Sequence, residues 1–234
     1  MADNMENIEN TENTENQESN SVKETKSNFN LLKEVWEWFY TIAIALIIVI
    51  IIKTFLFDIV RVDGPSMNPT LIHNDRLIVT KLNYSPEVGD IVILDSSYKT
   101  RQEYYSEYEQ EKGKELGTLS KIMLYPSLPQ DAKHRYYVKR VIGMPGDEVD
   151  IKGGNVYVNG NILIEPYLDG PTRITDYSVD YPVTVEEGHV FVMGDNRSNS
   201  TDSRISSLGQ IPFDAILGKS QLRIWPFSAF GKTE

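Results

Sequence analysis

Two residues that lie far apart in the chain, Ser66 and Lys139, have the side chains best suited to chemistry. Ser66 stands in the segment Gly64–Pro69, where glycine and proline favour a tight turn that would present its hydroxyl to a substrate. Lys139 stands inside the apolar run Tyr136–Ile142, and burial lowers the pKa of a lysine by up to about 3–5 units. Because a neutral amine can accept the proton of a serine hydroxyl, the pair predicts a serine hydrolase that needs no histidine.

A third segment, Met193–Arg204, supplies polar side chains that could support this pair. It follows a Val-Phe-Val run and consists of small polar residues, which predicts a loop after a strand. In that loop the hydroxyl of Ser200 could hold the lysine amine in place. The aspartates of the loop could pair with its arginines, namely Asp195 and Asp202 with Arg197 and Arg204. Met67, beside the serine, could either line a pocket or simply pack.

Composition argues against several other chemistries. The chain has no cysteine, which excludes disulfides, thiol nucleophiles and cysteine-ligated metals. Its histidines, His73, His134 and His189, share no short metal-ligand spacing, and we expect surface or hydrogen-bonding roles for them. A Ser-His-Asp triad has no support, and neither a metal nor an organic cofactor is expected. The net charge of −11 argues against a nucleic-acid partner.

The N-terminal part divides into a tail and an apolar segment. Residues 1–34 repeat Glu-Asn and offer almost nothing to bury, so we expect a disordered acidic tail. Residues 35–57 include twenty residues from Trp38 to Phe57 with Lys53 as the only charge, about 30 Å of helix and enough to cross a bilayer. A cleaved signal peptide would need a small-residue site after its core, and a soluble helix would rarely be apolar on every face.

We therefore expect one uncleaved transmembrane helix in the cell membrane. The lysines that precede it, Lys23, Lys26 and Lys33, slightly outnumber Lys53 and Arg61 behind it, which favours a cytoplasmic N-terminus and an extracellular body.

The remaining body, residues 58–234, has the pattern of a mainly β, antiparallel domain. Short runs of valine and isoleucine alternate with glycine and proline turns, at 77–79, 91–94, 136–142, 156–158, 190–193 and 222–225. Asn155–Ile164 predicts a hairpin closed by Asn159-Gly160. The polar stretch at about 98–135 breaks the pattern and predicts a mobile surface insertion between strands, with a polar helix at 103–115 and sparsely packed tyrosines.

Three of these segments together resemble the signature motifs of the bacterial type I signal peptidases. They are Gly64–Leu71, Tyr137–Asp147 and Gly194–Arg204, and they follow an N-terminal anchor in the same order as in that family. The resemblance runs from the anchor to Phe227, outside the tail and the insertion, and is closer to the compact Gram-positive enzymes with one anchor.

The resemblance implies a role for each matching residue. Ser66 is similar to the nucleophile, Lys139 to the general base and Ser200 to the serine that orients the amine. Asp202 and Arg204 match a supporting ion pair, and Asp195 belongs to the same loop. The backbone N–H of Ser66 is implied in the oxyanion hole. Some members add a serine hydroxyl two positions before the nucleophile, where this chain has Gly64.

The resemblance implies a membrane-anchored endopeptidase that removes signal peptides from exported preproteins and accepts small residues at the first and third positions before the cut. Two alternatives stay open. One is a self-cleaving Ser/Lys peptidase of the SOS-repressor type, against which the apolar segment and the lack of a DNA-binding domain count. The other is a membrane-tethered β-module without catalysis, in which Ser66 and Lys139 are structural.

Overall fold

The computed structural model describes residues 33–81, 84–168 and 170–233. The chain divides into two compact units, residues 1–54 and 55–234, and each is described by itself. The tail expected at residues 1–34 lies outside the described residues except for its last two positions.

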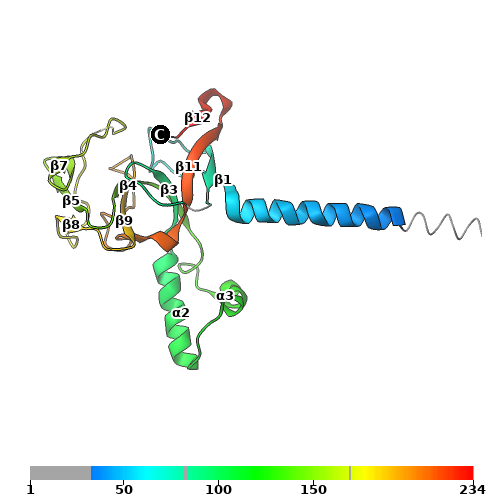
Figure 1. Cartoon of the computed structure of the whole chain (residues 1–234). Helices are drawn as coiled ribbons and strands as arrows, with labels where there is room; N and C mark the ends of the chain where they lie inside the picture. The colour runs from blue at the N-terminus through cyan, green and yellow to red at the C-terminus, as the bar shows by residue number, and fades with distance from the viewer. Residues whose placement is uncertain (1–32, 82–83, 169, 234) are drawn as a thin grey trace, which may run out of the picture. The chain divides into compact units, whose positions relative to one another are not determined.

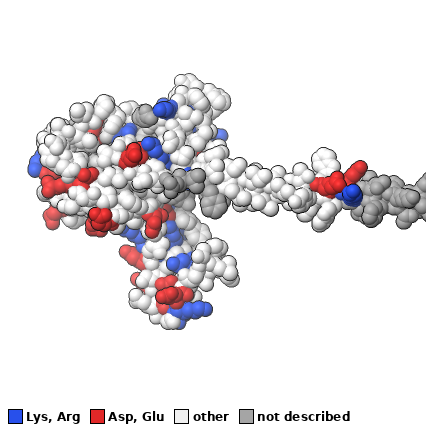
Figure 2. All heavy atoms as spheres, in the orientation of Figure 1, with Lys and Arg blue, Asp and Glu red and all other residues white. Residues whose placement is uncertain are grey.

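The first unit contains a helix over Lys33–Ile51 that is long and apolar enough to cross a membrane. The helix ends in a short π-helical turn, Ile52–Leu56, and β1 begins at Phe57, which the sequence pattern had placed in the helix. The face seen in Figure 2 is uncharged along most of the helix, and its charged side chains gather at the N-terminal end. A solvated helix with this surface would expose an apolar patch much larger than soluble proteins tolerate.

The second unit is built on an eight-stranded antiparallel sheet (Figure 1). Its strands lie in the order β1-β2-β11-β3-β4-β9-β10, and β12 pairs with β11. Their bounds are β1 Phe57–Arg61, β2 Arg76–Thr80, β3 Ile91–Asp95, β4 Tyr136–Gly143, β9 His189–Met193, β10 Ile211–Pro212, β11 Ile216–Trp225 and β12 Gly231–Lys232. Strands that are distant in sequence, such as β2 and β11, are therefore neighbours in the sheet. The sequence pattern alone could not predict this strand order.

A smaller four-stranded sheet has the order β7-β6-β5-β8. Its strands are β5 Glu148–Lys152, β6 Asn155–Val158, β7 Asn161–Ile162 and β8 Val183–Thr184. The predicted hairpin is present, because β6 pairs with β7 and the two turn residues have positive φ, 53° at Asn159 and 76° at Gly160. The prediction of a mainly antiparallel β fold behind one apolar N-terminal helix is confirmed.

The valine and isoleucine runs supply the core, because one face of each strand packs against apolar neighbours. One cluster joins β3, β4 and β9 through Val92, Val141 and Val192. A second lies under the Ser66 turn and includes Val62, Met67 and Leu71. A third fills the space between the two sheets around Ile142, Val149 and Phe191. Short 3₁₀ turns complete the fold at Tyr125–Ser127, Phe213–Ala215 and Phe227–Ala229.

Between β3 and β4 the chain forms two helices, which we call the helical insertion (residues 98–135). Helix α2 covers Tyr98–Lys112 and ends at Gly113 in the left-handed conformation, whereas α3 covers Thr118–Leu124. The helix predicted at 103–115 thus starts five residues earlier and stops three residues earlier. Tyr105 is buried with Leu128 and Ala132 in a small cluster of its own, which is denser packing than the sequence suggested for these tyrosines.

Candidate active site

Ser66 lies in the turn region between β1 and β2, held by backbone hydrogen bonds on both sides. Asn68 N donates to Pro65 O at 3.0 Å, and Leu71 N donates to Met67 O at 2.9 Å. Gly64 has φ +94°, a conformation that side chains disfavour even though a Cβ here would meet no atom within 4 Å. The backbone conformation thus favours glycine at position 64.

Met67 points away from solvent and is fully buried. It packs with Val62 and Leu71 in the cluster under the turn, and it is not among the residues that line the neighbouring cleft. Met67 therefore packs under the Ser66 turn, and its expected part in substrate binding stays a prediction.

Lys139 reaches Ser66 from the middle of β4. Its Nζ lies 2.9 Å from Ser66 Oγ and 2.9 Å from the carbonyl oxygen of Val138, and the residue is only 2% exposed. The ring of Tyr137 lies 5.1 Å from Nζ. A neutral amine in this position can donate to the Val138 carbonyl and accept the serine proton with its lone pair.

Burial is the largest cause of an unusual charge state at Lys139. It lowers the pKa of the amine from 10.5 to about 8, because the ammonium loses its hydration in the protein interior. Asp202 and Asp195 attract the ammonium and raise the pKa, whereas Arg204 repels it and lowers the pKa. The net result is an amine that is substantially neutral at mildly alkaline pH.

The loop Gly194–Arg204 lies against the Ser66 turn. Asn196 N donates to Ser66 O at 3.0 Å, and its side-chain amide donates to Pro65 O at 3.2 Å. Gly194 packs so closely that a Cβ there would overlap both Ser66 O and the Ser200 hydroxyl, so this position requires glycine. The three segments singled out in the sequence therefore meet at one place.

The charged residues of the loop form three buried ion pairs, one as expected and two with partners outside the loop. Asp202 pairs with Arg204 at 2.8 Å, both fully buried, and Asp202 also accepts from Gly194 N at 3.0 Å. Asp195, however, pairs with Arg140 at 2.7–2.9 Å, and Arg197 pairs with Glu165 instead. The expected Asp195–Arg197 pair is wrong, because Arg140 reaches Asp195 from the neighbouring strand β4.

Ser200 lies in the same cleft as Ser66 and Lys139. Its hydroxyl oxygen is buried and has no hydrogen-bond partner within the described part of the chain. The orienting hydrogen bond to the lysine amine that the resemblance implies is therefore not formed in this structure.

Two contributors to the site escaped the sequence reading, Arg140 and Thr70. Arg140 follows the lysine and should point to the opposite face of β4, where it holds Asp195. Thr70 donates its hydroxyl to the same carboxylate at 2.5 Å. Both lie within the quoted motifs, yet only the tertiary arrangement identifies their shared partner.

A cleft of about 600 Å³ contains Ser66 and Lys139. One wall is formed by residues 60–66, a second by 136–139 and a third by 198–201 with Thr175 and Ile205. On the side away from β3, strand β4 pairs with β9 only from Arg140 onward, so its first half borders the cleft as an open edge. No group of three or more potential metal-ligating side chains occurs among residues 33–81, 84–168 and 170–233.

Comparison with known proteins gives a consistent result. A model of the family described as signal peptidase, peptidase S26, matches residues 35–225. Signal peptidase I of Bacillus licheniformis is 36% identical over 220 residues, which cover 90% of this chain and 99% of that protein. Signal peptidase I T of Bacillus subtilis (strain 168) is 36% identical over 227 residues, 92% of this chain and 96% of that protein.

Among solved structures, the crystal structure of a signal peptidase I from Enterococcus faecalis V583 aligns with a TM-score of 0.38 and 24% identity. The alignment covers 58% of this chain and 97% of that chain.

Proposed function

The chain belongs to the signal peptidase family, peptidase S26, and from this premise we propose that it cleaves the signal peptides of exported preproteins with Ser66 as nucleophile and Lys139 as general base. Membership of a family of serine endopeptidases favours catalysis over the alternative of a β-module in which Ser66 and Lys139 are structural. The observation that carries the proposal is the contact of 2.9 Å between Lys139 Nζ and Ser66 Oγ inside an open cleft.

The proposed reaction follows from the positions of these two groups. The neutral Lys139 amine takes the proton from Ser66 Oγ as the oxygen attacks the scissile carbonyl carbon. The resulting ammonium returns this proton to the leaving amine when the peptide bond breaks. Water, deprotonated by the same amine, then hydrolyses the ester and regenerates the serine hydroxyl.

Backbone groups supply the further requirements of this reaction. Among the described residues the Ser66 N–H donates no hydrogen bond to the chain, so it is available to a developing oxyanion. The positive φ of Gly64 keeps the turn tight without a side-chain donor at that position. We propose that Ser200 orients the amine once substrate fills the cleft, and that Asp195, Asp202 and Arg204 keep the loop in place. Met67 contributes to substrate binding by packing that holds the turn.

The substrate is expected to bind in an extended conformation, because the first half of β4 does not pair with β9 and can accept a peptide strand at this edge. We propose that residues 35–57 anchor the enzyme in the bilayer with the tail, residues 1–34, in the cytoplasm and the domain 58–234 outside. This placement would put the cleft on the side where the cleavage site of an exported preprotein emerges.

The test is cleavage of a model preprotein by the full-length protein in detergent, comparing wild type with Ser66→Ala and Lys139→Met. Each variant should lose activity by about 10³-fold or more, since the two groups act as one unit. Lys139→Met should keep its melting temperature or raise it, because a buried amine is replaced by an apolar side chain of similar length. Lys152→Met, which removes an exposed lysine, is the matched control and should cleave normally.

A folded Ser66→Ala or Lys139→Met variant with wild-type activity would disprove the dyad.

A further inference from the structure

A second hollow lies beside the active-site cleft and is formed by the helical insertion. It has a volume of about 420 Å³ and is lined by Tyr105, Thr118, Lys121, Ile122, Tyr125 and His134. Ile122 leaves 64% of its surface exposed, and α3 has no buried residue. A large apolar side chain that stays exposed on a helix without buried residues is typical of a binding surface.

Three neighbouring rings connect the wall of the hollow to the wall of the cleft. Tyr136, the first residue of β4, lines the cleft and stacks on His134 at 5.6 Å between ring centroids. His134 in turn lies 5.1 Å from the ring of Tyr125, and both line the hollow. A peptide that follows the open edge of β4 away from Lys139 therefore passes Tyr136 and enters the hollow.

The side chains of His134 and Tyr125 in this lining already have hydrogen-bond partners. His134 Nδ1 lies 2.6 Å from Asp95 Oδ2, and its backbone N–H donates to Tyr125 Oη at 3.1 Å. The Lys121 ammonium lies 5.3 Å from the centre of the Tyr105 ring. Arg101 also pairs with Asp95, so the base of the insertion is fixed to the end of β3.

We propose that the helical insertion is a subsite for the apolar segment that precedes the cleavage site of a signal peptide. This inference rests on the proposed function. Of the two sides of such a cleavage site, the upstream side carries a run of about 7–15 apolar residues, which matches the lining of the hollow. From Lys139 to His134 is five residues, about 17 Å at about 3.3 Å per residue of extended chain, so substrate residues about four to seven before the cut reach the hollow that His134 and Ile122 line.

The test uses two fluorogenic peptides of equal length and the full-length enzyme in detergent. Both have the same cleavage site, but one has leucine and the other serine at positions four to seven before the cut. We expect the wild type to cleave the leucine peptide with a kcat/KM about tenfold higher, or about 1.4 kcal/mol. Ile122→Ser should reduce that ratio to near one, and Ile122→Leu should retain it.

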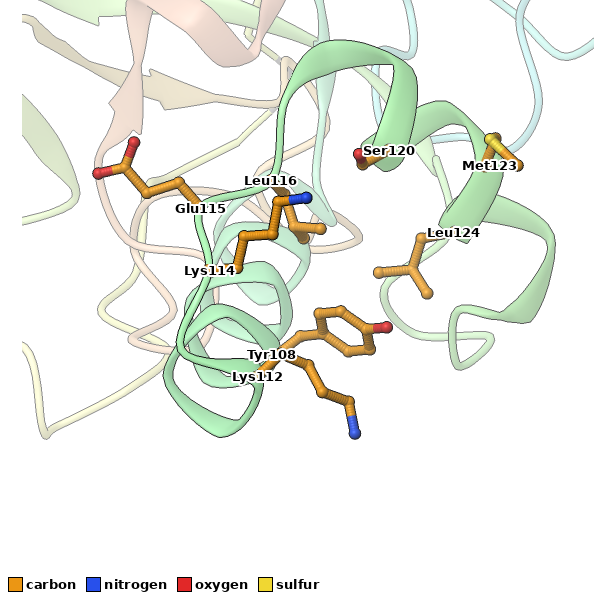
Figure 3. A pocket seen from close by; sticks show the side chains of 8 residues that line it. All are labelled: Tyr108, Lys112, Lys114, Glu115, Leu116, Ser120, Met123 and Leu124. Carbon is orange, nitrogen blue, oxygen red and sulfur yellow. The ribbon is translucent and has the colours of Figure 1, made fainter.

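Met123→Ser is the matched control, because Met123 is 75% exposed on the same helix but lines a different hollow, between α2 and α3 (Figure 3). It should keep the wild-type ratio. Equal cleavage of both peptides by the wild type, or equal ratios for Ile122→Ser and Met123→Ser, would overturn the subsite while leaving the proposed function intact. Failure of the proposed function would give a different result, because Ser66→Ala would then still cleave both peptides.

Discussion

The molecule uses a buried aspartate–arginine pair in two regions with different consequences. In the loop Gly194–Arg204, Asp202 and Arg204 are both fully buried near Lys139. At the base of the helical insertion, Asp95 and Arg101 are almost as buried, but they tie α2 to the end of β3. The first pair shapes the environment of a reactive group, and the second attaches an element.

The electrostatic effect of each pair explains this difference. Burial, the largest cause, lowers the pKa of Lys139; Asp202 and Asp195 raise it, Arg204 lowers it, and the net shift is downward. At the insertion, burial by itself would raise the pKa of Asp95, but hydrogen bonds from Arg101 and His134 outweigh it and lower the pKa. A buried aspartate–arginine pair is thus present both in the active-site loop and at the base of the insertion. Only the pair in the loop lies close enough to Lys139 to change the pKa of its amine.

The largest expected effect comes from removing one carboxylate of each pair. Asp202→Asn and Asp95→Asn each leave a buried arginine without its counter-charge, which costs about 3–5 kcal/mol of unfolding free energy. Urea unfolding would measure both losses. Activity of the folded fraction should fall for Asp202→Asn and stay near wild type for Asp95→Asn on a substrate with a polar upstream segment. Equal activity losses in the two variants would remove the distinction between the two regions.

The pH dependence of kcat/KM is a second measurement that distinguishes the active-site loop from the base of the insertion. Because the pKa of Lys139 is about 8 and the neutral amine is the reactive form, kcat/KM should fall about tenfold per pH unit below pH 8, about 100-fold by pH 6. Asp202→Asn removes an attraction for the ammonium, so it should move this limb to lower pH. Asp95→Asn should leave the limb in place, because Asp95 is not among the charges that act on Lys139. A limb that does not respond to Asp202→Asn would contradict the assigned base.

Serines in the active-site loop give the smallest and most specific effect. The Ser200 hydroxyl has no partner in the described part of the chain, so Ser200→Ala should leave the melting temperature unchanged or slightly higher. It should nevertheless lower kcat by about tenfold if Ser200 orients the amine in the substrate complex, as general-base catalysis of this kind contributes about 10²–10⁴-fold in full. The neighbouring buried Ser203 accepts a hydrogen bond from Val192 N at 3.0 Å, and Ser203→Ala should instead lose about 1 kcal/mol of stability. Unchanged kcat in Ser200→Ala would remove its orienting role.

The sequence by itself determined the elements that depend only on neighbouring residues in the chain, namely the apolar helix, the strands and the hairpin. The uncharged run after Trp38 predicted an apolar helix because its length and composition match a bilayer, and β-branched runs with Asn-Gly predicted strands and a hairpin. Three motifs in one order identified Ser66, Lys139 and the loop as candidates. In the polar insertion the predicted helix, 103–115, differs at both ends from α2, Tyr98–Lys112, because α2 has no apolar stripe that would mark its ends in the sequence.

Only the tertiary structure decided which groups meet. In the strand order β11 and β3 lie between β2 and β4, yet the folded domain brings Lys139 on β4 to within 2.9 Å of Ser66. The Lys139 amine is buried there by residues from several segments, and this exclusion of solvent lowers its pKa. The same packing pairs Asp195 with Arg140 rather than Arg197, and it leaves the Ser200 hydroxyl without a hydrogen-bond partner among the described residues. It also brings the insertion to the cleft through the contact of His134 with Tyr136. Sequence spacing encodes none of these contacts, because each joins side chains that only the folded sheet places together.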